Sequence, residues 1–242
     1  MIFSTTGIVL RNIKYGDTSG VVTILTRQFG LQSYLINGIR TSGKSSKAHL
    51  YQPASLVDME VYHNELKKLQ RVRDARWSYV YKDVFTSVSK HSAALFMVEL
   101  LQKTLQHPEE NERLFDFCER CFLLLDSSMH AVSLYMPVFF ALHLPAYLGF
   151  GIDNNFSEKF LYFNVREGIF TDDASDADVE QDASINEVLS FILKIQDTSL
   201  LASLKLERHR RQRALRLIER FYKWHIAELT GFKTLEVFEQ MF

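Results

Sequence analysis

The residue pattern of this chain changes near Lys82, and that change limits what the chain can fold into. Before it, short β-branched runs are separated by turn residues, and after it apolar residues recur at helical spacing. The charge changes at the same place. Residues 1–82 contain 12 Lys and Arg against 5 Asp and Glu, whereas residues 83–242 contain 16 against 24. We therefore predict two domains, a basic strand-rich domain over 1–82 and an acidic helical domain over 83–242.

Five runs in the first region are predicted as strands. They are Thr6–Leu10, Val21–Thr26, Leu31–Ile36, Ser55–Tyr62 and Leu69–Tyr79. Five short strands in so short a stretch suit a small closed barrel, and the five-stranded OB-fold is a common solution of that kind. The longest stretch between strands, Asn37–Gln52, is polar and basic. The fold class predicted for the whole chain is α+β, with an OB-fold barrel followed by an α-helical domain that carries a small β-hairpin.

The second region is predicted to be mostly helical. Helices are expected at Phe85–Gln106, Glu109–Leu125, Val132–Leu148, Ile185–Ile195 and Glu207–Leu229, with a short one at the end. Phe160–Phe170 resembles a hairpin and Thr171–Asp182 an acidic loop, so these two features occupy about 158–182.

The stretch Ser127–Ile152 has no Asp, Glu, Lys or Arg, which makes it a candidate membrane span. It contains two histidines together with Pro137 and Pro145, and its flanks are acidic rather than basic. We expect a buried helix that is kinked or broken at the prolines, and no membrane association.

Residues 38–45 match the phosphate-binding loop pattern G-x-x-x-x-G-K-[ST] at every position. In an NTPase this loop must open a helix whose N-terminus faces the phosphates, within a parallel sheet. Only seven residues separate Ser45 from Pro53, and mostly helices follow downstream. We therefore predict a basic loop between strands, with a P-loop NTPase as the disfavoured alternative.

The other features typical of catalytic or metal sites are incomplete. The two cysteines, Cys118 and Cys121, lie in a helical pattern, and the sequence has no second cysteine pair to complete a zinc site. We expect two buried cysteines on one helix face. The eight histidines are scattered, and no G-x-S-x-G motif occurs. The chain is therefore predicted to be no enzyme and to need no cofactor.

A basic barrel is suited to bind nucleic acid, with cations along the backbone and aromatic rings against the bases. The candidate DNA-binding cations are Arg11, Lys14, Arg27, Arg40, Lys44, Lys47, Arg71 and Arg73. The candidate base-stacking aromatics are Tyr15, Tyr34 and Tyr51. Each ring could instead belong to the core, and each cation to an ordinary solvated face.

A second basic stripe lies on the long predicted helix near the C-terminus. Arg213, Arg216, Arg220 and Lys223 share one face, opposite an apolar stripe that is expected to face the core. This stripe could face solvent, or dock DNA or an acidic peptide, or be offset by the neighbouring acidic loop at 171–182.

Several of these segments resemble the RecO family of bacterial recombination mediators. In the N-terminal part the resemblance is carried by residues 6–10, 14–19, 22–26, 29–30, 38–40 and 50–53. Farther on it is carried by Leu114-Phe115, Leu148-Gly149-Phe150, residues 164–168 and residues 232–235. It covers essentially the whole chain, and it is more specific in the N-terminal block.

The resemblance implies a function in DNA repair and homologous recombination. Members of the family bind single- and double-stranded DNA and anneal complementary strands. They also bind the acidic C-terminal tail of single-strand-binding protein (SSB) and, with RecR, help to load the recombinase RecA. A cytoplasmic, nucleoid-associated protein is expected. The alternative is an adaptor without catalytic activity that docks acidic protein tails.

The chain departs from the family pattern at one place. Many members carry a four-cysteine zinc site that begins just after the Leu-Gly-Phe segment, but residues 151–182 contain no cysteine. Asn154, Asn155 and Phe156 stand in this region instead. We predict that the protein holds no zinc, with packing and the acidic loop in place of the metal.

Overall fold

The computed structural model describes residues 1–39 and 48–241, with the side chains of the last helix described as far as Val237. The chain forms two compact units. One comprises Met1–Lys82 together with Leu101–Leu123, and the other comprises Asp83–Leu100 together with Leu124–Phe242. Parts of two helices therefore belong to the same unit as the strands, and the domain boundary after residue 82 stays a prediction.

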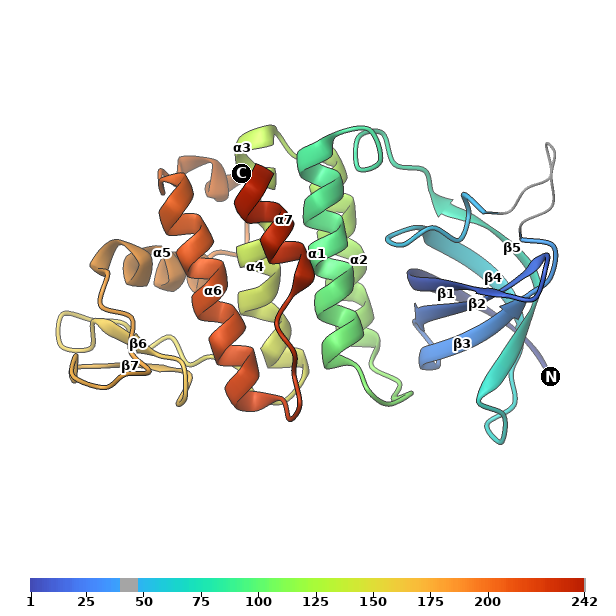
Figure 1. The fold of residues 1–242 in the computed structure, drawn as a ribbon, viewed down its shortest axis with the longest axis horizontal. Helices are drawn as coiled ribbons and strands as arrows, with labels where there is room; N and C mark the ends of the chain where they lie inside the picture. Colours follow the sequence, from blue (N-terminus) through green and yellow to red (C-terminus); the bar gives the residue numbers. More distant parts are fainter. Residues whose placement is uncertain (40–47, 242) are drawn as a thin grey trace. The chain divides into compact units, whose positions relative to one another are not determined.

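The first unit contains a closed five-stranded barrel (Figure 1). Its strands are β1 Ile2–Tyr15, β2 Ser19–Thr26, β3 Gly30–Ile36, β4 Leu56–Tyr62 and β5 Leu69–Tyr79. They follow the order β1-β2-β3-β5-β4, in which only the β3–β5 pair is parallel. This arrangement confirms the predicted OB-fold-like barrel.

The barrel closes because β1 is long enough to pair on both sides. Its first part pairs with β4, from Ile2 opposite Tyr62 to Ile8 opposite Leu56, and its second part pairs with β2. A bulge between Val9 and Arg11 lies within the β2 pairing, and bulges bend strands at such points. The prediction of a strand limited to Thr6–Leu10 was therefore too short.

The helical elements broadly follow the predicted order. The α-helices are α1 Val88–Thr104, α2 Glu112–Ser127, α3 His130–Ser133, α4 Met136–His143, α5 Ala183–Lys194, α6 Arg208–His225 and α7 Lys233–Met241. Two 3₁₀ helices, η1 Leu144–Tyr147 and η2 Thr198–Ser203, connect them. Buried aromatic residues, among them Phe140, Phe221 and Tyr222, fill the core of the second unit.

The uncharged segment after α2 is broken at its prolines, as predicted. Pro137 stands in the first turn of α4 and Pro145 in the first turn of η1, where the missing backbone N–H costs nothing. All residues from Met136 to Leu142 are buried. Among the described residues, no helix combines the length and the apolar character needed to cross a membrane.

The predicted hairpin is formed by β6 Tyr162–Asn164 and β7 Ile169–Thr171. Gly168 at the turn has a φ of 70°, a conformation that glycine adopts without strain. Asn155 ties the incoming chain to β7, because its side chain donates to the Phe170 carbonyl at 2.8 Å and accepts from the Phe170 amide at 2.7 Å. The hydrogen bonds of Asn155 thus hold the hairpin in place. The family resemblance implies a zinc site in this region for many members.

Candidate nucleic-acid interface

A continuous row of outward-facing residues crosses all five strands of the barrel. Their neighbours in sequence, such as Phe3, Val22, Tyr34 and Val61, face the core, so alternation directs the row to the outside. Cross-strand pairing links its members one to the next. We call this row the outer belt, and it consists of Ile2, Tyr62, Arg71, Leu35, Val21 and Ile13.

The outer belt is apolar apart from one cation. Ile2 and Tyr62 are each 47% exposed and Ile13 is 43% exposed, which is high for apolar side chains on neighbouring strands. Arg71 stands directly between Tyr62 on β4 and Leu35 on β3. The belt therefore combines exposed apolar surface with a guanidinium group in one line.

Three other predicted residues adjoin the belt on β1. Arg11 and Tyr15 lie two residues to either side of Ile13 and so share its face, and Tyr15 is 57% exposed. Lys14 is exposed opposite Gly20, which has no side chain to cover it. Within the described part of the chain, Arg11, Lys14 and Arg71 form no ion pair. These positive charges are free to meet a polyanion.

The other two predicted cations of the described barrel are already paired. Arg27 contacts Asp116 at 2.5 Å and Glu119 at 3.2 Å, and its guanidinium carbon lies 4.9 Å from the centre of the Phe115 ring. α2 of the same unit thus already occupies the Arg27 guanidinium, and a DNA contact by Arg27 stays a prediction. Arg73 pairs with Glu60 at 3.3 Å, although its side chain is 54% exposed.

Glu119 shows how closely Arg27 is tied to α2. Burial raises the pKa of the Glu119 carboxyl, and the adjacent Arg27 guanidinium opposes that rise. Arg27 thus helps to keep a partly buried carboxylate charged, which is a packing role.

The stacking prediction is wrong for two of the three tyrosines. Tyr34 is 0% exposed and Tyr51 is 1% exposed, and both rings pack in the barrel core. Burial raises the pKa of both hydroxyls well above the ordinary value. Their positions, Tyr34 on a short strand and Tyr51 in the polar stretch that follows it, gave no sign of burial. Of the predicted rings, only Tyr15 is accessible to a base.

Sequence reasoning missed two exposed aromatics, Tyr62 and Trp77. Trp77 on β5 is 46% exposed, close to the value for Tyr62. A signal for Tyr62 was present, because it continues the outward, polar phase of β4 with Asp58 and Glu60. Trp77 follows a bulge between β4 and β5, which disturbs the alternation from which its direction would be predicted.

The predicted contacts Arg40, Lys44 and Lys47 lie outside the described residues, so their role stays a prediction. On either side of this segment the described chain forms turns at 37–39 and 48–54 and then enters β4. Among the described residues, the first α-helix begins at Val88. The described residues on both sides are therefore turns that follow β3 and precede β4.

Cys118 and Cys121 are both buried on α2 and unpaired, which confirms the expected packing role. Burial raises the pKa of the Cys118 thiol and raises that of Cys121 to about 12. In the part of the chain that the structure describes, no three His, Cys, Asp or Glu side chains are grouped so that they could hold a metal ion.

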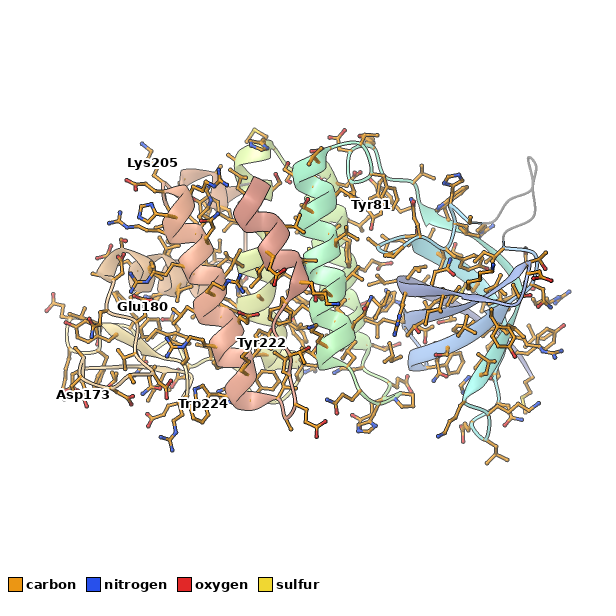
Figure 2. The ribbon with its side chains drawn as sticks, in the orientation of Figure 1. Tyr81, Asp173, Glu180, Lys205, Tyr222 and Trp224 are labelled. Carbon is orange, nitrogen blue, oxygen red and sulfur yellow. The ribbon has the colours of Figure 1, made fainter. Side chains whose placement is uncertain are left out.

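Each cation of the basic stripe on α6 contacts a carboxylate of its own unit, in which Figure 2 labels Glu180 and Trp224. Arg213 donates to Glu180 through Nε at 3.1 Å and Nη2 at 2.5 Å, and Arg220 contacts Asp178 at 3.1 Å. The other two predicted cations contact one buried carboxylate, since Arg216 and Lys223 reach Glu219 at 3.1 and 3.8 Å. Of the predicted alternatives, pairing with the acidic segment is seen for Arg213 and Arg220, and docking of DNA or an acidic peptide stays a prediction.

The N- and C-terminal parts of the chain match two family models. Residues 1–81 match Recombination protein O N terminal, and residues 86–236 match Recombination protein O C terminal. A protein named DNA repair protein RecO from Flavobacterium johnsoniae is 29% identical over 250 residues, and its namesake from Phocaeicola vulgatus is 28% identical over 256 residues. Each comparison covers 100% of both chains.

An OB-fold-like barrel followed by a helical region is the architecture that the structure shows, and OB-fold barrels include many nucleic-acid-binding modules. Together with the matches, this fixes the family. The chain belongs to the RecO family of recombination mediators, which functions in DNA repair and recombination.

Proposed function

We propose that this protein is a mediator without catalytic activity that binds single- and double-stranded DNA through the barrel and anneals complementary strands. The observation that carries the proposal is the outer belt with its neighbours. Arg11, Lys14 and Arg71 are exposed and unpaired among the described residues, beside the exposed rings of Tyr15 and Tyr62. Cations of this kind bind phosphates and release counterions, which makes the affinity steeply dependent on salt.

Annealing follows from the same surface. Two complementary strands repel each other through their phosphates, and a shared basic surface lowers that repulsion. No covalent bond in the DNA is made or broken in this process, so it needs no cofactor and no nucleotide hydrolysis.

The proposed protein partners rest on family membership. They are RecR, the acidic tail of SSB and, indirectly, RecA, and the proposed site of action is the nucleoid in the cytoplasm. The stripe on α6 is a weaker candidate for an acidic tail than the sequence indicated. Each of its four predicted cations already contacts a carboxylate of its own unit, so a tail would have to displace that carboxylate.

Titration of fluorescent single-stranded DNA at several salt concentrations, with and without ATP, tests the proposal. We expect tight binding at low salt, a steep salt dependence and no effect of ATP. Lys44→Ala and Lys47→Ala should each reduce the salt slope by about 1. Absence of binding even at low salt would reject the DNA function and favour the adaptor that docks acidic tails. Nucleotide hydrolysis that Lys44→Ala abolishes would instead revive the NTPase.

A further inference from the structure

Three of the cavities formed by the described residues lie on the barrel unit, and they differ in charge. One of about 450 Å³ is lined by Asp58, Glu60 and Asp74 together with Arg27 and Arg76, so that carboxylates outnumber cations and both arginines already pair with acids. Another, of about 670 Å³, mixes Lys67 and Lys68 with two glutamates. The third, of about 510 Å³, has no Asp or Glu among its described lining residues. We call it the Tyr62 cavity, and its lining includes Tyr62, Arg71, Lys67, Leu35, Leu69 and Gln70.

The Tyr62 cavity lies on the outer belt. Tyr62 and Arg71 are direct cross-strand partners, and such partners on one face have their Cβ atoms about 5 Å apart. Leu35 is the partner of Arg71 on its other side. An aromatic ring, a guanidinium group and an aliphatic side chain thus line one hollow in that order.

The β4–β5 connection that forms one wall is held in place by a buried amide. Gln70 is 3% exposed, and its Nε2 donates to the carbonyls of Asn64 at 2.9 Å and Lys67 at 2.5 Å. Its Oε1 accepts from the Asn64 amide at 3.0 Å. These bonds fix the backbone of Lys67 while its side chain remains exposed.

A ring stack holds the same connection from its β4 end. His63 stacks on Phe29 with the ring centres 3.9 Å apart and the planes 15° from parallel. A wall fixed in this way loses little conformational entropy when a ligand binds.

We propose that the Tyr62 cavity binds one unstacked nucleotide of single-stranded DNA, with the base against Tyr62 and its phosphates at Arg71 and Lys67. This inference rests on the proposed DNA function and adds the residues that distinguish single strands from duplex. The base of a single strand offers its π-face to an aromatic side chain, whereas a base inside a duplex is covered by its neighbours. Because no Asp or Glu is among the described lining residues, a phosphate would meet no like charge there. Leu35 and Leu69 offer apolar surface to the face of the base.

The neighbouring cavity indicates where the strand continues. His63, Lys67 and Gln70 line both the Tyr62 cavity and the cavity of about 670 Å³. The second cavity adds Lys68, whose charge suits the next phosphate along the strand, and it also adds Glu65 and Glu110, which offset part of that charge.

The test compares Tyr62→Ala, Tyr62→Phe and Leu66→Ala in binding to a dT oligonucleotide, an abasic oligonucleotide of the same length and a duplex. Leu66 is the matched control, because it is 94% exposed on the same connection but lines neither cavity. We expect Tyr62→Ala to weaken dT binding about tenfold, which lies within the range expected for the loss of one stacked base. Tyr62→Phe should retain the affinity, and Leu66→Ala should bind like the wild type.

The abasic strand and the duplex separate stacking from general effects. Tyr62→Ala should bind both like the wild type, because neither offers an unstacked base. The inference would be overturned if Tyr62→Ala lost equal affinity for dT and for duplex, or if its affinity for dT were unchanged. In both cases the proposed DNA function would stand. Failure of the wild type to bind any of the three nucleic acids would overturn both.

Arg71→Ala provides a second readout that does not depend on the ring. It should lower the salt slope for dT and for the abasic strand by about 1 each, because the phosphate contact does not need a base. A slope that changes for neither strand would remove Arg71 from the cavity's function and overturn the inference.

Discussion

The protein carries two sets of basic residues that differ in ion pairing among the described residues. On the outer face of the barrel, Arg11 and Arg71 stand beside exposed apolar groups and form no ion pair among the described residues. On α6, Arg213 and Arg220 reach the segment 178–180, and Arg216 and Lys223 reach Glu219. Basic residues thus remain without ion pairs among the described residues in one unit and pair with carboxylates in the other, and the position of the nearest carboxylates decides which.

The largest effect expected from this difference is on the stability of the helical unit. Glu180→Ala should lower the free energy of unfolding by about 2 kcal/mol, because Glu180 is 4% exposed and accepts two hydrogen bonds from Arg213. Arg213 is half-exposed and can regain water, which keeps the loss below that of a fully buried pair.

The chain offers a reporter for this measurement. It has two tryptophans, one in each unit, and Trp224 donates to Asp178 beside the pair. Urea unfolding followed by Trp224 fluorescence in a Trp77→Phe background reports on the helical unit. Glu187→Ala is the control, since this exposed α5 carboxylate should cost less than about 0.5 kcal/mol. Equal shifts for both variants would show that the pair to Arg213 adds nothing.

The next effect tests the comparison through DNA. The double variant Arg11→Ala with Arg71→Ala should reduce the salt slope of DNA binding by about 2, because two free cations are removed. The matched double variant Arg220→Ala with Lys223→Ala removes two cations that are 45% exposed but paired. Its slope should equal that of the wild type, and a fall of about 2 there would break the distinction between the two sets.

A smaller effect is expected at the start of α5. Asp182 caps this helix by accepting from the Ser184 amide at 3.0 Å, and Asp182→Ala should cost about 1 kcal/mol. The Ser184 hydroxyl and amide hydrogen bonds and the nearby Arg210 hold the pKa of the Asp182 carboxyl below its usual value.

A carboxyl whose pKa is lower in the folded than in the unfolded protein stabilises the fold at pH values above its unfolded-state pKa. That stabilisation is lost as the pH falls through its folded-state pKa. The difference between wild type and Asp182→Ala should therefore be complete at neutral pH and shrink below about pH 4. Urea unfolding at a series of pH values measures it. A difference that stays constant down to pH 3 would show that the charge of Asp182 plays no part.

Arg27 should behave like the α6 set although it lies on the barrel. Arg27→Ala should lower the stability of the barrel unit by about 1 kcal/mol, because it removes contacts with Asp116, Glu119 and Phe115. The pKa of Glu119, which burial already raises, should rise further. Trp77 fluorescence in a Trp224→Phe background follows this unit, and the neighbouring exposed residue gives the control Gln28→Ala. A reduced DNA salt slope would return Arg27 to the binding face.

The smallest effect is expected from metal removal. We predict no stoichiometric zinc in the purified protein and no change in Tm with EDTA, because Asn155 and the Glu180–Arg213 pair hold the region where a zinc site was in question. Elemental analysis tests this directly, and one zinc per chain would refute it.

The sequence predicted most elements because each rests on a local pattern. Short β-branched runs marked β2 to β4, alternation marked β5, helical spacing marked α1, α2, α5 and α6, and the two prolines marked the breaks around α4. The length of β1 was missed, since its two ends are held by different partners, β4 and β2, that are far apart in the sequence. The site was predicted only in part. Local sequence patterns did not predict that Tyr34 faces the closed interior of the barrel. They also did not predict that Tyr62 and Arg71 are cross-strand neighbours.

By itself, the sequence determined the order of strands and helices, the separation of charge along the chain and the resemblance to a family, because these are properties of residues and their spacing. Tertiary structure decided which charges remain free. Barrel closure placed Arg71 between Tyr62 and Leu35 without a carboxylate beside it, and the packing of segment 178–182 against α6 brought acids to its arginines. The physical reason is that electrostatic interactions depend on distance in space, which the spacing of residues along the chain does not fix.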